Sequence, residues 1–245
     1  YRMVNKTKPL IEPETQLGKS IPELLDQLMS YELRTRYRAR RELRDRPKRD
    51  VYTALSSWLT ADASPQQLCE AMWIQESFRD IDAGLLKRIL QSDDFHARSA
   101  AVHSMVNEHE RLEDCFPLLQ QLASDPHPRV RLEVVRGLSF FPTEDALKTL
   151  LAISQLPRDY WIDYTLEHSL HAMEPVWKGR DNAENFLAEA PEEHRAFFKR
   201  YRNMTGPGGA AVEPLEIADD VDQPQWRRDR AMERLAGIGG GNASR

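Results

Sequence analysis

Residues 157–177 concentrate rings and carboxyl groups that could contact a ligand. The rings belong to Tyr160, Trp161, Tyr164, His168, His171 and Trp177. Aromatic side chains packed at the end of a helix are the simplest explanation of this stretch. The next is a contact with a ligand or a protein partner, and its candidate residues are Tyr160, Trp161, Tyr164 and Trp177.

A metal ion is the third interpretation of the same stretch. His168 and His171 are three positions apart, a spacing that could place two imidazoles near one ion. Asp163 or Glu167, one helical turn apart, could add a carboxylate. A third convincing ligand is missing, so the sequence assigns no residue to a metal site.

The second stretch whose side chains could bind a partner is basic. Residues 34–49 carry nine Lys and Arg residues against two acids. A solvated helix whose Arg stems cover apolar surface is the simplest explanation. The alternatives are an acidic protein partner, with Arg34, Arg38 and Arg41 as candidate contacts, and, with less support, nucleic acid. Tyr37 is the one aromatic residue in this stretch, which gives little support for base stacking.

Motifs of the common enzyme classes are missing. The sequence contains no nucleophile elbow, phosphate-binding loop, dinucleotide fingerprint or CxxCH haem-attachment motif. Cys69 and Cys115 stand apart in helical contexts, which favours two buried thiols over a disulfide. We expect no catalytic, cofactor-binding or metal-binding residues in this chain, and no enzymatic activity.

Composition narrows the class further. The 245 residues are 30% charged and 40% hydrophobic, and their net charge is −5. A mildly acidic chain argues against a dedicated nucleic-acid binder, and no apolar run approaches the roughly 18 residues of a membrane span. The first residues lack an initiator Met and the apolar core of a signal peptide, so we expect a chain cut from a longer protein.

Three arginines mark a repeated helix. Arg36, Arg98 and Arg131 are each followed by Ala or Val three positions later and by Leu or Met seven positions later. These spacings place both apolar side chains on one helical face. Arg98 and Arg131 are 33 residues apart, and Arg36 and Arg98 are 62 apart, nearly two such intervals. An interval of this length is typical of helical solenoids, including HEAT-like repeats.

Each repeat is expected to be a helical hairpin. An amphipathic helix precedes each Arg-led helix, and a short polar turn joins the two. We expect Asp93 and Asp125 to accept main-chain N–H bonds at the start of the helices that follow them, as N-cap or first-turn acids. We also expect each repeat arginine to meet an Asp of its own or a neighbouring turn, in a partly exposed ion pair worth under about 1 kcal/mol.

The sequence therefore predicts an all-α fold, a HEAT-like α-α superhelix in the form of a right-handed solenoid of about five hairpins. An extended linker over residues 1–19 leads into the hairpins, which fill residues 20–178. Capping helices follow over residues 179–204. Residues 205–245 are rich in Gly, Pro and acids and read as a linker or tail with one short helix.

Four phrases of the sequence resemble the HEAT-repeat region of large bacterial PVC-type CxxCH haem-binding proteins: RTRYRARREL, HARSAAV, PRVRLEVVRGLSFFP and DYWIDYTLEHSLHAMEPVW. The resemblance covers residues 1–178, and the first residues resemble the end of that family's sugar-dehydrogenase-like propeller. Neither the propeller nor CxxCH is present in this sequence. No haem ligand or dehydrogenase residue is therefore carried over to any position.

The resemblance implies a spacer in a longer, exported electron-transfer protein. Its partners would be neighbouring domains of the same chain or another protein, and haem c would belong to a separate domain. Two enzymatic alternatives stay open for HEAT-like folds. A DNA alkyl-base glycosylase would use an aromatic residue and an acid, such as Trp161 and Asp163, and a tetrapyrrole lyase-like protein would bind a bilin or haem.

Overall fold

The computed structural model describes residues 12–177 and 190–205, with Thr7 and a few single positions between residues 218 and 236. All regular secondary structure within these residues is helical. Contacts divide the chain into two compact units, the N-terminal unit Tyr1–Leu112 and the C-terminal unit Glu113–Arg245. The predicted all-α fold of helical hairpins is confirmed in each unit.

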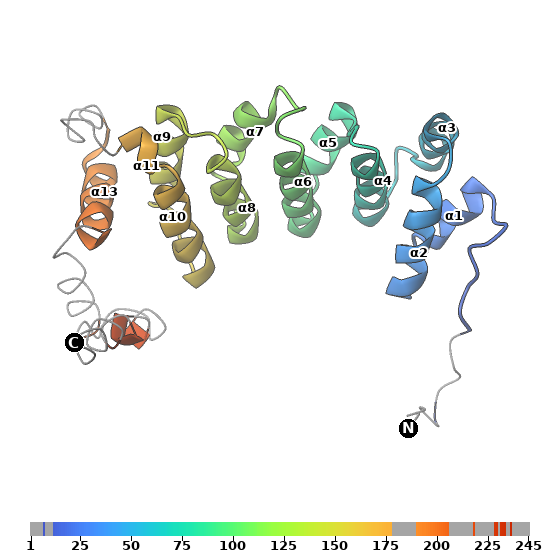
Figure 1. Ribbon diagram of the computed structural model, residues 1–245, viewed down its shortest axis with the longest axis horizontal. Coiled ribbons are helices and arrows are strands. Elements are labelled where there is room, and N and C mark those ends of the chain that lie inside the picture. Colours follow the sequence, from blue (N-terminus) through green and yellow to red (C-terminus); the bar gives the residue numbers. More distant parts are fainter. Residues whose placement is uncertain are drawn as a thin grey trace, which may run out of the picture. The chain divides into compact units, whose positions relative to one another are not determined.

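Three helical hairpins make up the N-terminal unit (Figure 1). They are α1 (Ile21–Gln27) with α2 (Leu33–Arg44), α3 (Lys48–Trp58) with α4 (Pro65–Ser77), and α5 (Ala83–Leu90) with α6 (Phe95–Asn107). α2 packs against α4 and α4 packs against α6, while α1 packs against α3. The second helices of the hairpins therefore form one layer, which is the arrangement that a helical repeat requires.

Two more hairpins belong to the C-terminal unit (Figure 1). They are α7 (Cys115–Leu122) with α8 (Pro128–Leu138) and α9 (Glu144–Ile153) with α10 (Tyr160–Ala172), followed by α11 (Glu174–Trp177) and α13 (Glu192–Thr205). α8 packs against α10, and α13 packs against α9 in the position expected of a capping helix. The other predicted capping helix, over residues 182–190, falls almost entirely outside the described residues.

The repeated apolar positions form the core, as predicted. The residues three and seven positions after the repeat arginines are fully buried: Ala39, Leu43, Ala101, Met105, Val134 and Leu138. Burial of each of the larger side chains contributes roughly 2 kcal/mol relative to exposure. The apolar side chains three and seven positions after each arginine, which define the repeat, therefore also hold each Arg-led helix onto its neighbours. No described helix is long and apolar enough to cross a membrane.

The predicted capping acids are right in part: Asp125 accepts a hydrogen bond from the His127 main chain at 2.8 Å at the start of α8, but neither Asp93 nor Asp125 is an N-cap. Asp94, not Asp93, is the N-cap of α6, and its carboxylate accepts a hydrogen bond from the His96 main chain at 2.8 Å. The N-cap of α8 is His127, whose Nδ1 accepts from the Arg129 main chain at 3.2 Å. A cap must stand directly before the first helical turn to reach its free N–H groups, and this boundary was misplaced.

Two of the three repeat arginines, Arg98 and Arg131, bind the turns through main-chain oxygens, whereas Arg36 lies near the Glu70 carboxylate of α4. Arg131 Nη1 donates to the carbonyl oxygens of Asp125 at 2.7 Å and Pro126 at 3.1 Å, and Nη2 donates to that of Pro157 at 2.5 Å. Arg98 Nη1 donates to two carbonyl oxygens of the turn before α6. The expectation of a partly exposed carboxylate pair is wrong for Arg131, because the side chain is 4% exposed and its partners are carbonyls. It joins the turn before α8 to the turn before α10.

Cys69 and Cys115 are buried and are not joined by a disulfide, as expected. Burial raises the pKa of the Cys69 thiol to about 12 and that of the Cys115 thiol to about 11. Because the thiolate is the reactive form, we predict negligible labelling by a maleimide at neutral pH in the folded chain. Two equivalents should react within minutes after addition of guanidinium chloride. Rapid labelling of the folded protein, read by intact mass, would contradict this burial.

Candidate docking surface

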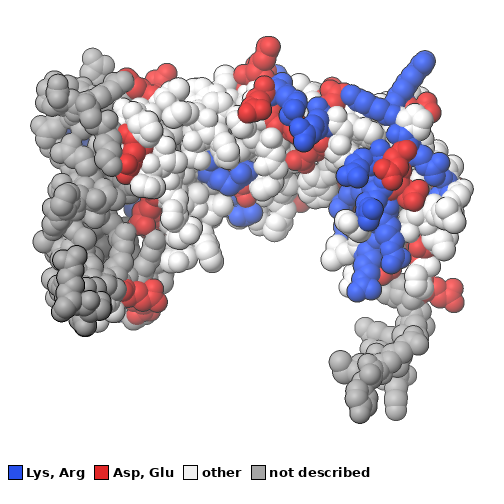
Figure 2. Space-filling view, in the orientation of Figure 1, with Lys and Arg blue, Asp and Glu red and all other residues white. Residues whose placement is uncertain are grey.

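The exposed side of α2 carries four arginines. Thr35, Ala39 and Leu43 bury the opposite side of this helix in the core. The exposed arginines are Arg34, Arg38, Arg41 and Arg44, which are called the arginine face below. Their spacing of four and three residues aligns them along one side of the helix. Figure 2 shows Lys and Arg side chains gathered over this part of the molecule.

Two other arginines of α2 are used inside the unit. Arg40 donates from Nε and Nη2 to the two carboxylate oxygens of Glu70, at 2.7 and 2.8 Å. Arg36 Nη1 lies 3.8 Å from the same carboxylate, which is fully buried in α4. The basic stretch of the sequence thus has two roles: Arg36 and Arg40 neutralise a buried acid, whereas the arginine face points away from the core.

The arginine face has no counterion within the described part of the chain. None of its four members forms an ion pair there, although Arg41 lies over the ring of Tyr37 at 5.9 Å. Like charges three and four positions apart destabilise a helix, and Arg34 in the first turn also opposes the helix dipole. An anionic partner would remove both costs.

Apolar side chains accompany these charges. Tyr31 is 92% exposed, Leu33 is 70% exposed and Tyr37 is 56% exposed. Tyr37 is four positions after Leu33 and four positions before Arg41, so both residues lie on the same side of α2 as the arginines. Aromatic side chains and arginine are the residues enriched in protein interfaces. This composition suits a protein partner better than a phosphate backbone.

A pocket of about 480 Å³ lies beside the arginine face. One wall is α2 with its C-cap: the helix contributes Arg38, Arg41 and Glu42, and Asp45 follows directly after it. The other wall is the segment of residues 13–17 that precedes α1. The described part of the predicted extended linker therefore packs on the N-terminal unit and forms part of a concave surface.

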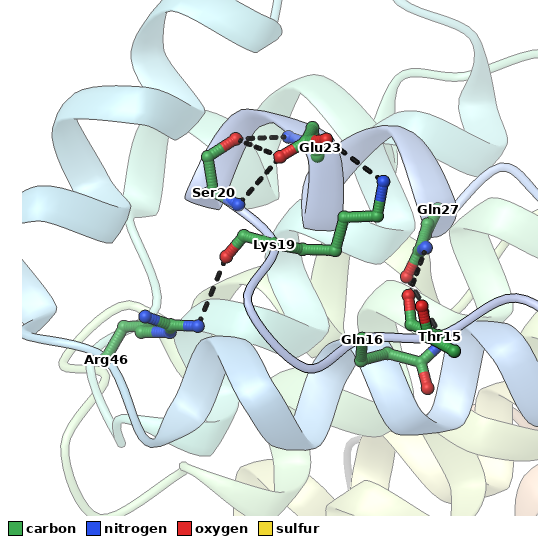
Figure 3. Close-up of polar contacts among 7 residues, drawn as sticks. All are labelled: Thr15, Gln16, Lys19, Ser20, Glu23, Gln27 and Arg46. Atoms are coloured by element: carbon green, nitrogen blue, oxygen red, sulfur yellow. Dashed lines mark hydrogen bonds and ion pairs between the residues drawn. The ribbon is translucent and has the colours of Figure 1, made fainter.

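Hydrogen bonds hold that segment against α1 (Figure 3). Gln16 Nε2 donates to Gln27 Oε1 at 3.2 Å, and Gln27 Nε2 donates to the carbonyl oxygen of Thr15 at 3.0 Å. Arg46 Nη2 donates to the carbonyl oxygen of Lys19 at 3.2 Å. Gly18 has a φ of 76° in the turn between these contacts, a conformation that glycine adopts without strain.

The start of α1 secures the same wall. Ser20 and Glu23 form a capping box, in which each side chain bonds the other residue's main-chain N–H. Hydrogen bonds from the Ser20 main chain and hydroxyl, together with the nearby Lys19 ammonium, lower the pKa of Glu23 to about 2. The carboxylate is therefore ionised at neutral pH and keeps the entry into α1 in one geometry.

The second candidate contact region lies on α10 in the C-terminal unit and is partly exposed. Trp161 is 63% exposed and Tyr164 is 41% exposed, while Tyr160 is half-buried between them. For Trp177 the partner contact is wrong and the simpler explanation, aromatic packing at a helix end, agrees with the structure. Its ring is 6% exposed, its Nε1 donates to the Leu170 carbonyl oxygen, and it packs edge-to-face on Phe198. The indole of Trp177 therefore packs in the core beyond α10.

The acids and histidines of this region have structural partners. Asp163 lies 2.6 Å from Arg158 and is 14% exposed, so it does not share the exposed side of Trp161. The glycosylase-like pair that the sequence offered is not brought together. His171 Nδ1 lies 2.9 Å from a Glu174 oxygen, and His168 contacts the ring of Tyr164. Among the described residues, no three potential metal ligands converge.

Sequence reasoning found three of the four members of the arginine face and missed its surroundings. Arg44, Leu33 and Tyr37 have the same helical period as Arg34 and Arg41, so a helical projection of α2 would have included them. The pocket has no such local signal, because residues 13–17 meet α2 only after the chain has folded back over α1.

Comparisons with known proteins support the repeat architecture. Residues 81–171, from the start of α5 nearly to the end of α10, match the family model described as HEAT repeats. No curated protein matches the chain. Among solved structures, an engineered protein determined by a structural genomics consortium shares 16% identity at a TM-score of 0.44, covering 89% of this chain and 99% of its own. That likeness carries no argument, and the repeat architecture rests on the helical hairpins together with the match of residues 81–171 to the HEAT-repeat model.

Proposed function

We propose that this chain is a non-catalytic HEAT-like scaffold that binds an acidic protein surface through the arginine face of α2. The observation that carries the proposal is the set of four exposed arginines that has no counterion in the described part of the chain. Helical repeats present extended side-chain arrays on a rigid frame, which is how such folds are used in binding. HEAT repeats over residues 81–171 support the scaffold part of the proposal.

The charge balance favours a protein over nucleic acid as the partner. Residues 1–112 carry 18 basic and 17 acidic residues, so the arginine face is a local feature of a nearly neutral unit. Nucleic-acid binding domains usually carry a strong overall excess of positive charge. The exposed Leu33 and Tyr37 add apolar area that a phosphate backbone does not use.

The context of the scaffold follows from the sequence resemblance and belongs to the same proposal. In an exported parent protein with a propeller and a c-type haem domain, the acidic surface would belong to a neighbouring domain of the same chain. The scaffold would then fix the separation of those domains without holding a cofactor itself. The glycosylase alternative has no such support, because Asp163 is held by Arg158.

Charge reversal of the arginine face tests the proposal. The probe is a fluorescein-labelled peptide in which Glu alternates with Gln, measured by anisotropy at low salt. We expect the double variant Arg34→Glu/Arg44→Glu to bind it at least tenfold more weakly than the wild type, because attraction becomes repulsion at two points. The wild-type affinity should also fall as salt is raised.

The matched control is Arg49→Glu/Lys148→Glu, which makes the same change of net charge at exposed positions outside α2. It should bind the peptide about as well as the wild type. Equal weakening in both double variants would mean that net charge alone attracts the peptide. Tighter binding of a short DNA duplex than of the peptide would assign the face to nucleic acid instead.

A further inference from the structure

The pocket beside the arginine face contains charges of both signs. Arg38 and Arg41 line it from α2, together with Glu42 and Asp45, and Glu14 lines it from the opposite wall. A surface that bound any polyanion would be expected to exclude carboxylates from its most concave part, since like charges at an interface are repulsive. We therefore expect the pocket to accept fewer kinds of anionic partner than the arginine face around it.

The two arginines are the cations available in this pocket. Neither Arg38 nor Arg41 has an ion pair within the described residues, and both are exposed. A guanidinium can bind a carboxylate through two parallel hydrogen bonds. Arg38 and Arg41 are three positions apart on α2 and can contact the same acidic side chain.

The carboxylates of the pocket differ in how far they are already satisfied. Glu42 lies 3.7 Å from Arg46, and Glu14 accepts a hydrogen bond from the Ser30 hydroxyl at 3.3 Å. Asp45 is exposed and has no ion pair within the described residues. Asp45 and the remaining acceptor capacity of Glu14 thus offer a place for a cation next to the place for a carboxylate.

The geometry of the pocket does not depend on a partner. Its outer wall is held by the Gln16–Gln27 and Thr15–Gln27 hydrogen bonds, and the capping box of Ser20 fixes the helix that follows (Figure 3). A site that is formed before binding loses less conformational entropy when the partner arrives. The relative placement of its positive and negative groups can therefore act as a recognition pattern.

We infer that this pocket makes the scaffold selective for a protein segment of alternating charge, in which a carboxylate meets Arg38 and Arg41 and an adjacent Lys or Arg meets Asp45 and Glu14. The inference rests on the proposed function and narrows its partner. A uniformly acidic segment or a phosphate chain would satisfy the arginines and be repelled by the two carboxylates. Selectivity of this kind combines an attractive contact with a repulsive one against the wrong partner.

The experiment compares two labelled peptides of equal length, one in which Glu alternates with Lys and one in which Glu alternates with Gln. The wild type should bind the Glu/Lys peptide more tightly than the Glu/Gln peptide. In the variant Glu14→Gln/Asp45→Asn the preference should reverse, with a change of about tenfold in the ratio of the two dissociation constants. Glutamine at position 14 retains an oxygen for the Ser30 hydroxyl, so the wall stays in place.

The control variant Asp62→Asn/Glu110→Gln removes two exposed carboxylates of the same unit that do not line the pocket. Its ratio should equal that of the wild type. An unchanged ratio in Glu14→Gln/Asp45→Asn, or an equal change in the control, overturns the inference and leaves the proposed function standing. Failure of both peptides to bind the wild type at low salt overturns the proposed function itself.

Discussion

Replacement of Arg131 by methionine is expected to lower the free energy of unfolding by about 3 kcal/mol. The guanidinium donates to three carbonyl oxygens from two turns, in a place that is almost inaccessible to water. Hydrogen bonds from a charged donor are stronger than neutral ones, and buried acceptors that lose a donor are costly. The cost of burying the charge offsets part of this stabilisation. Urea unfolding followed by circular dichroism at 222 nm gives the value.

Arg129→Met on the same helix is the control for this prediction. Arg129 is 51% exposed and forms an ion pair at 2.8 Å with Glu133, whose buried carboxylate also meets Arg136 at 3.0 Å. Because Arg136 still neutralises Glu133 in this variant and Arg129 itself is exposed, we expect a loss of only about 0.5 kcal/mol. Similar losses in the two variants would mean that the main-chain contacts of Arg131 add nothing to the packing of α8, and the structural account of the repeat arginine would be wrong.

The second large effect is expected for Glu70→Gln, which should lower the free energy of unfolding by about 2 kcal/mol. Glu70 is fully buried and neutralises Arg40 through two hydrogen bonds, with Arg36 close by. Glutamine keeps the shape but presents one amide N–H₂ group to a guanidinium that can only donate. The arginines are 33% and 20% exposed, so solvent limits the loss to less than that of a fully buried pair.

A double-mutant cycle with Arg40→Met isolates this interaction. If the bidentate pair carries the effect, the double variant should be clearly more stable than the sum of the two single losses predicts. The exposed Glu110→Gln serves as the control and should stay within about 0.5 kcal/mol of the wild type. A loss no larger than the control's would show that Glu70 is not needed to neutralise α2. The arginine face should still bind the Glu/Gln peptide in each variant that folds.

The helical hairpins could be read from the sequence because their signals are local. An arginine followed by apolar residues three and seven positions later defines one buried stripe, and Ala39, Ala101 and Val134 are buried as that stripe requires. The caps were placed less well. Asp93 and Asp94 are adjacent and both acidic, so composition alone does not choose between them, and the helix boundary decides.

The candidate site was predictable to the extent that it lies on one helix. Arg34, Arg38 and Arg41 follow from helical period, and the structure places all three on the exposed side of α2. For Trp177 the sequence left two explanations open, aromatic packing at a helix end and a partner contact. The structure buries it against Phe198, which is distant in sequence and arrives with α13.

The sequence by itself determined the helices, their pairing into hairpins and the side of each helix that enters the core, since these depend on residue spacing within a dozen positions. Only the tertiary structure decided which arginines pair with a buried acid and which stay exposed without an ion pair among the described residues. Arg40 meets Glu70, thirty positions away, while Arg38 faces a pocket formed with residues 13–17. A charged group is neutralised by whichever opposite charge the folded chain brings within a few ångströms, and no local pattern records that distance.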